Sequence, residues 1–179
     1  MDDVKWILHP NKNEITSELK SKLVNKYLKN GYISCTYKHY LSLKDIVENN
    51  YEYSVIMEDN IGFVYDNIPN RLELYLTQLP ENWDILFDSK WASYKSIDEE
   101  KVTADKIVYK KSNKITKYCH GGTRVAQFYF LNLNCAKKLY ENYLPFDNPP
   151  DWWMNTLFRK LNINSYWSEP AFIEVRKNH

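Results

Sequence analysis

Short apolar segments alternate with amphipathic segments along this chain, and the alternation restricts its possible folds more than any other feature. Residues 53–57 and 83–87 are strand-like runs, whereas residues 33–48 and 151–161 have apolar side chains at helical spacing. Strands that alternate with helices form layered structures in which the helices cover a sheet. The sequence therefore predicts a three-layer α/β fold with a mostly parallel central sheet.

Similar patterns predict further elements and a single domain that spans residues 1–179. The expected strands are 4–8, 107–109, 125–130 and 171–175, and the expected helices are 14–29, 69–79 and 135–143. Asn30 and Gly31 are expected to end the helix at 14–29, because glycine readily adopts the left-handed conformation. Residues 88–118 are mostly polar and weakly patterned, and we expect active-site loops there, apart from the strand at 107–109.

Composition excludes several classes of protein. The 24 Lys and Arg residues nearly balance 23 Asp and Glu residues, which argues against a nucleic-acid partner because such partners require a basic face. No apolar run approaches the roughly 20 residues of a membrane-spanning helix. Cys35, Cys119 and Cys135 are widely spaced and predict neither a disulfide framework nor a zinc site. The first residues lack a signal-peptide pattern, so we expect a soluble cytoplasmic protein.

The clearest chemical motif follows the predicted strand at 53–57. Glu58, Asp59 and Asn60 stand at its carboxyl end, where open α/β sheets bind ligands. Carboxylate and amide oxygens suit Mn²⁺ or Mg²⁺, and such a cation can bridge to a diphosphate. The alternative is that these side chains cap the next turn or face solvent. The motif predicts a metal site formed by all three residues.

Three other side chains are candidates for a binding or catalytic role. His39 and Lys38 lie on the predicted helix 33–48, where a histidine is commonly a hydrogen-bonded packing residue and a lysine is commonly solvated. Lys38 could instead neutralise a phosphate. Asp151 begins a predicted helix after a proline-rich turn, so its carboxylate could cap the free backbone amides there.

Several segments occur in an order that points to a known family. They are Gly31–His39, against a family pattern G-E-I-G-C-x-x-S-H; Glu58–Asn60, against E-D-D; Trp83–Leu86, against W-D-I-hydrophobic; Thr123–Leu139; Pro145–Asp151; and Ser168–Pro170. Taken together, these segments resemble glycosyltransferase family 25, the lipopolysaccharide and collagen sugar transferases. The resemblance spans roughly residues 30–175.

The resemblance implies a fold of the GT-A type and transfer of a sugar, galactose or glucose, from a UDP-sugar to a hydroxyl of a glycan or protein. It implies that a divalent cation is held by the acidic motif at 58–60, with Lys38 and His39 beside the donor. It also suggests inversion at the sugar, with Asp151 as the base that takes the acceptor's proton. Lipopolysaccharide biosynthesis is the expected setting.

The chain also departs from the family pattern. Asn60 replaces an aspartate, Lys38 replaces a serine, and Tyr32 replaces a glutamate. The opening strand and the arginine-containing loop that contact the nucleotide in longer members are not recognisable, so the N-terminal part is interpreted as shortened. These departures leave a second hypothesis open, a non-catalytic relative that binds or scaffolds. The sequence indicates no particular oligomeric state.

Overall fold

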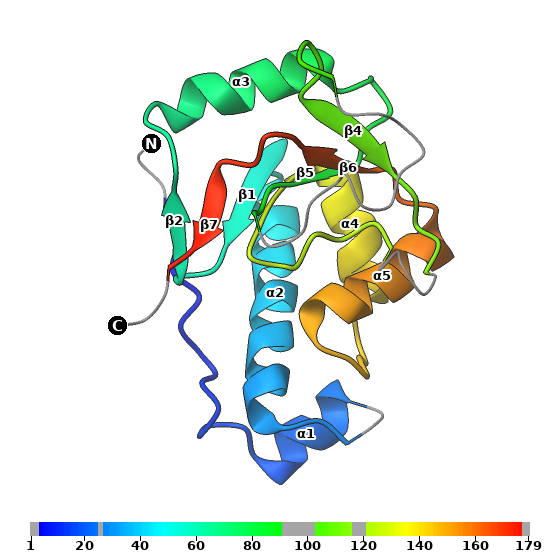
Figure 1. Ribbon diagram of the computed structural model, residues 1–179. Coiled ribbons are helices and arrows are strands. Elements are labelled where there is room, and N and C mark those ends of the chain that lie inside the picture. Colours follow the sequence, from blue (N-terminus) through cyan, green and yellow to red (C-terminus); the bar gives the residue numbers. More distant parts are fainter. Residues whose placement is uncertain (1–3, 25–26, 91–102, 116–120, 177–179) are drawn as a thin grey trace.

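The computed structural model describes residues 4–24, 27–90, 103–115 and 121–176, and it shows a mixed α/β architecture (Figure 1). The helices are α1 (Ser17–Leu23), α2 (Asn30–Asn49), α3 (Ile68–Gln78), α4 (Leu133–Asn142) and α5 (Pro150–Leu161). The strands are β1 (Tyr53–Met57), β2 (Ile61–Phe63), β3 (Ile85–Phe87), β4 (Val108–Lys111), β5 (Phe128–Asn132), β6 (Ser165–Ser168) and β7 (Ile173–Val175).

Five strands form the central sheet in the order β1-β5-β3-β6-β4, and β2 and β7 form a separate antiparallel ribbon. Among the described strands of the central sheet, only β3 and β6 pair in parallel, with Leu86 opposite Tyr166. The other three pairings are antiparallel, including β1 with β5, where Val55 lies opposite Phe130. The prediction of a mostly parallel sheet is therefore wrong.

The error has a clear structural cause. β5 lies between β1 and β3 and runs against both, so β1 shares the direction of β3 and β6 but is separated from them by an antiparallel strand. Side-chain periodicity specifies which face of a strand is buried, but it contains no information about the strand's direction or neighbour. The shared direction nevertheless places the carboxyl ends of β1, β3 and β6 toward the same side of the sheet.

Apolar side chains cover both faces of the sheet, as expected for three layers. Along β5, Tyr129 and Leu131 belong to one buried cluster, whereas Phe128 and Phe130 belong to the other, following the two-residue period of a strand. The first cluster includes residues of α2, α4 and α5, and the second includes residues of α3 and β7. Figure 1 shows α2, α4 and α5 gathered beside the sheet and α3 lying across one end of it.

The two N-terminal helices differ from the expected ones at their boundary. α1 is short, and Thr16 caps it by accepting a hydrogen bond from the amide of Leu19. Asn30 and Gly31 begin α2 rather than ending the preceding helix, so that prediction is wrong. α2 continues to Asn49 and ends at Asn50, whose left-handed conformation is a common helix terminus.

Residues 4–8 form no strand, contrary to the prediction. They lie alongside α2, where Lys5 forms an ion pair with Asp45. The hydroxyl of Ser34 donates to the carbonyl of Pro10 at 2.7 Å and attaches the next turn to the same helix. Val4, Trp6 and Leu8 remain more than half exposed, because no strand of the sheet receives them.

The remaining predictions hold with shifted boundaries, and two strands were missed. The strand at 53–57 is confirmed, as are helices close to 33–48, 69–79, 135–143 and 151–161. The strand expected at 125–130 is β5, that at 107–109 is β4, and that at 171–175 is β7. β2 and β6 were not predicted, since each is short and β6 begins and ends with serine. Residues 91–102 and 116–118 of the expected loops lie outside the described residues.

Gly121 supplies a test of this packing. Its φ of +93° is strained for other residues, and an added Cβ would lie 2.5 Å from Oδ1 of Asn155, which accepts a hydrogen bond from the amide of Thr123. We expect Gly121→Ala to lower the free energy of unfolding by about 1–3 kcal/mol. Urea denaturation measures this, with Gly31→Ala as the control, because a Cβ at Gly31 meets no atom within 4 Å. Equal stability of the two variants would contradict the strain at Gly121.

Candidate functional site

The candidate site lies at the carboxyl end of β1, where Glu58 follows the strand. The amide of Glu58 donates to the carbonyl of Gln127 at 2.9 Å, so the pairing with β5 continues one residue past the strand. Its carboxylate is largely shielded, with 27% of the side chain exposed, and Oε1 accepts a hydrogen bond from the Cys35 thiol at 3.6 Å. Glu58 therefore faces α2 rather than open solvent.

Cys35 and His39 stand one helical turn apart on α2, so both side chains face the end of β1. The Nε2 atom of His39 lies 3.6 Å from Oε1 of Glu58, and Nδ1 lies 2.8 Å from the hydroxyl of Tyr129 on β5. The His39 side chain is only 5% exposed. The prediction that His39 is a hydrogen-bonded packing residue and the prediction that it belongs to the site are thus compatible.

The pKa values of these groups reflect burial and mutual contact. Burial alone raises the pKa of Glu58, but the hydrogen bonds and charge of His39 and the Cys35 thiol outweigh it and leave the pKa below its usual value. Burial and the neighbouring Glu58 carboxylate raise the pKa of Cys35 to about 12. The resulting arrangement is an ionised carboxylate that accepts from a neutral thiol.

Asp151 lies in the first turn of α5, near enough to Glu58 and His39 for their charges to affect its pKa. Burial and the nearby charge of Glu58 raise its pKa, although the backbone amides of Asp151 and Trp152 and the ring of His39 oppose the shift. Its contact with those amides means that Asp151 also stabilises the start of the helix, although the N-cap residue is Pro149. The structure therefore brings Asp151 into electrostatic contact with Glu58 and His39, residues 93 and 112 positions earlier in the chain.

The other members of the acidic motif behave differently from Glu58. Asp59 is exposed, whereas Asn60 is half-buried and its backbone carbonyl accepts from the amide of Arg176 at 2.8 Å. The Oδ1 atom of Asn60 is buried and has no hydrogen-bond partner among the residues that the structure describes. A cation is one group that satisfies such an acceptor, so the Asn60 oxygen fits the predicted ligand set.

Lys38 lies next to this group without joining it. The side chain is half-buried, and its positive charge lowers the pKa of Glu14, although the hydrogen bonds from His9 and Asn11 have the larger effect on that carboxyl. The same charge partly offsets the rise in the pKa of Cys35. Lys38 is thus close enough to the site for its charge to affect the pKa of Cys35.

Sequence reasoning assigned no role to Cys35 or Tyr129. Cys35 could have been found, because Cys35 and His39 are four residues apart on a helix that was predicted. Tyr129 gave no local signal, since its hydroxyl meets His39 across 90 residues of sequence.

A second buried polar group lies at the carboxyl end of β3 and was not predicted. Asp88 accepts hydrogen bonds from the hydroxyl of Ser168 and from the amides of Phe172 and Ile173, the latter two at 2.9 and 2.8 Å. Beside it, Arg124 donates to Glu169 at 2.6 Å. Burial, only partly offset by these donors, raises the pKa of Asp88 to about 6. These contacts join the last segment of the chain to the sheet.

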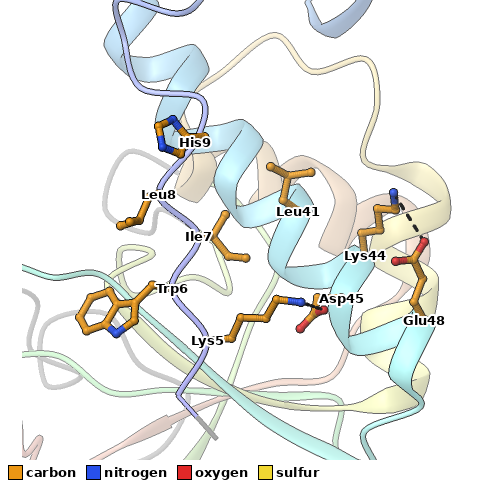
Figure 2. Close-up of a pocket in the computed structure, with 9 residues that line it drawn as sticks. All are labelled: Lys5, Trp6, Ile7, Leu8, His9, Leu41, Lys44, Asp45 and Glu48. Atoms are coloured by element: carbon orange, nitrogen blue, oxygen red, sulfur yellow. Dashed lines mark hydrogen bonds and ion pairs between the residues drawn. The ribbon is translucent and has the colours of Figure 1, made fainter.

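A surface pocket of about 430 Å³ lies elsewhere, between residues 5–9 and the outer side of α2 (Figure 2). Leu41, Asp45 and Glu48 line it from the helix face opposite His39, and Lys5 reaches across it to Asp45. Because neither the acidic motif nor Asp151 lines this pocket, it is separate from the candidate site.

The comparison with protein families identifies the family that the sequence resembles. The family model for glycosyltransferase family 25 (LPS biosynthesis protein) matches residues 2–154. The chain belongs to glycosyltransferase family 25. No curated protein matches it. Among the described residues, no helix is both long enough and apolar enough to cross a membrane.

Membership of glycosyltransferase family 25 suggests a transferase that uses a sugar donor and an acceptor, in lipopolysaccharide biosynthesis. The range that the family model matches includes four residues of the candidate site: Cys35, His39, Glu58 and Asp151. In the second buried polar group, Asp88 and Arg124 also lie within the matched range, whereas Ser168 lies beyond it.

The raised pKa of Asp88 predicts a pH dependence of stability. The folded protein keeps this proton up to about pH 6, whereas the unfolded chain loses it near 3.8, so the contribution of Asp88 is full below about pH 4 and is lost as the pH rises through about 6. The difference in unfolding free energy between wild type and Asp88→Asn should shift by about 2 kcal/mol between pH 4 and pH 7, in favour of wild type at the lower pH. Urea denaturation at both pH values measures the shift, and a difference that is independent of pH would contradict it.

Proposed function

We propose that this family member transfers a sugar, galactose or glucose, from a UDP-sugar to a hydroxyl of a glycan or protein, with inversion and with the help of a divalent cation. The observation that supports this proposal most is the approach of Asp151 to Glu58 and His39 at the carboxyl end of β1. A metal-assisted inverting transfer uses an acidic cation-binding motif and a separate carboxylate base, and these residues provide both types of group.

The donor side of the proposed site consists of the acidic motif and its neighbours on α2. Glu58, Asp59 and Asn60 would hold Mn²⁺ or Mg²⁺, and the unpartnered Oδ1 of Asn60 supports this assignment. A divalent cation held by these residues would supply positive charge to the leaving diphosphate. Lys38 adds positive charge beside the same group, and His39 orients Glu58 through their contact.

Asp151 is the proposed base. Burial raises the pKa of Asp151, which makes its carboxylate a stronger proton acceptor than an ordinary aspartate. In the proposed step the acceptor oxygen attacks the anomeric carbon, its proton passes to Asp151, and the bond from that carbon to the UDP oxygen breaks. The sugar is thereby inverted and UDP leaves.

The cation assignment is tested with Asp59→Ala. We expect hydrolysis of the UDP-sugar, and transfer to an acceptor, to fall by about 100-fold or more, because one negative ligand is lost where charge develops. Folding should be unaffected, because Asp59 is exposed. Asp66→Ala, which removes another exposed aspartate, is the matched control. Full activity of Asp59→Ala in a Mn²⁺-dependent UDP-sugar assay would show that the assignment is wrong.

The assignment of the base is tested with Asp151→Asn. We expect kcat for transfer to fall by about 10²- to 10⁴-fold, because proton removal is lost, while thermal stabilisation by UDP and Mn²⁺ persists. Rapid-quench measurement of a single turnover separates this loss from slow product release. A variant with normal kcat, or one that loses UDP binding together with activity, would place Asp151 outside the proton transfer.

A second candidate function is a non-catalytic module that binds a sugar nucleotide or scaffolds a partner. Two observations favour it: Asn60 contributes no charge, and the Glu58 carboxylate is already engaged by Cys35 and His39. Thermal unfolding with UDP and Mn²⁺ distinguishes the candidates, because a ligand at 100 times its dissociation constant stabilises by about 2.7 kcal/mol. Stabilisation without turnover of any UDP-sugar would favour a binding module, and neither response would favour a scaffold.

A further inference from the structure

Cys35, His39 and Glu58 bring three different kinds of metal ligand to one point. The thiol sulfur, an imidazole nitrogen and a carboxylate oxygen all lie within 4.8 Å of one another. They come from α2 and from the end of β1, and none of them is fully exposed. Cys35 and His39 belong to neither the acidic motif nor the cation site proposed above.

The two distances from Glu58 match those of a tetrahedral site, and the sulfur of Cys35 lies within 4.8 Å of a ring nitrogen of His39. Bond lengths of about 2.3 Å to sulfur and about 2.1 Å to nitrogen or oxygen place neighbouring ligand atoms about 3.4–3.6 Å apart. The observed separations from Oε1 of Glu58 are 3.6 Å to the sulfur of Cys35 and 3.6 Å to Nε2 of His39. Little rearrangement of these side chains would be needed to receive an ion.

We propose that Cys35, His39 and Glu58 form a binding site for a zinc-type transition-metal ion, which differs in its chemistry from the Mn²⁺ or Mg²⁺ site of the donor and would share Glu58 with it. Thiolate and imidazole ligands favour Zn²⁺ and its neighbours, whereas Mn²⁺ and Mg²⁺ favour oxygen ligands alone. The spacing of the cysteines did not predict such a site, because only Cys35 takes part and the other ligands come from different residue types.

Tyr129 prepares His39 for this role. When Nδ1 carries the proton and donates it to the Tyr129 hydroxyl, the lone pair of Nε2 is directed at Glu58 and Cys35. Metal-bound histidines commonly have their second nitrogen held in this way, which fixes the orientation of the ring. The nearly parallel stacking of the His39 and Tyr129 rings, 5.7 Å apart, restricts the ring further.

Three protein ligands leave one position of a tetrahedral zinc site for water or a substrate oxygen, as in catalytic zinc sites. Asp151 is near enough to Cys35 and Glu58 for its charge to interact with both. Cys35 is half-buried, which leaves a path for an ion to enter. In the metal-free protein its thiol is a neutral donor to Glu58, and the ion would displace that proton.

The site is tested by titrating the metal-free, full-length protein with Co²⁺, which takes the geometry of zinc and is coloured. We expect one equivalent to produce a thiolate-to-cobalt charge-transfer band and the intense visible bands of tetrahedral cobalt, and one equivalent of Zn²⁺ to abolish both. Weak octahedral bands without charge transfer would overturn the proposal.

Variants identify the ligands. Cys35→Ser should remove the charge-transfer band and weaken Zn²⁺ binding, measured by competition with a chromophoric chelator, at least about 100-fold. Cys135→Ala is the matched control, since Cys135 is buried in the helix-side core and should not affect the band. A band that survives in Cys35→Ser and disappears in Cys135→Ala would overturn the assignment.

A measurement on the unaltered chain covers the case in which Cys35→Ser does not fold. Zn²⁺ should protect Cys35 from alkylation, as mapped by mass spectrometry of its peptide, and equal alkylation with and without Zn²⁺ would contradict the proposal. Asp59→Asn separates this site from the proposed function, because it should weaken the response to UDP and Mn²⁺ but leave the cobalt spectrum unchanged. A protein without turnover that retains the spectrum would disprove the proposed function alone.

Discussion

Strand β5 is the element on which the rest of the structure depends. It pairs with β1 on one side and β3 on the other, and its alternating side chains enter both cores. Its Tyr129 hydroxyl also contacts His39, so the strand that organises the sheet also orients the candidate site. Because Tyr129 is fully buried, a polar partner for its hydroxyl is required, and His39 meets that requirement at 2.8 Å.

A chain of polar contacts runs from Tyr129 on β5 through His39 on α2 to Glu58 at the end of β1. A buried carboxylate is costly unless it is paired, and here His39 and the Cys35 thiol keep Glu58 ionised within an otherwise apolar region. The same contacts turn Glu58 inward while the adjacent Asp59 remains exposed. Neighbouring residues of one acidic motif therefore have different surroundings: Glu58 contacts a sulfur and a nitrogen atom, whereas Asp59 is exposed to solvent.

Membership of glycosyltransferase family 25 is consistent with this arrangement and gives it a setting. The acidic motif at the end of β1 and the aspartate at the start of α5 are distant in sequence but close in space. In the sheet described here β1 lies at one edge, and the segment 4–8 runs along α2 instead of joining it. The structural features that argue for transfer thus lie on the helix-covered side of β1.

The sequence by itself determined the elements whose signals are local. Periodicity and the residue types that begin helices predict, to within a few residues, the strand at 53–57 and the long helix α2. They also place Glu58 and Asp151 at the ends of their elements. Only the tertiary structure decided the direction of β5, the exclusion of residues 4–8 from the sheet, and the meeting of Cys35 with Glu58. These depend on which distant segment lies alongside, and pairing between distant segments is set by the packing of the whole chain rather than by any local pattern.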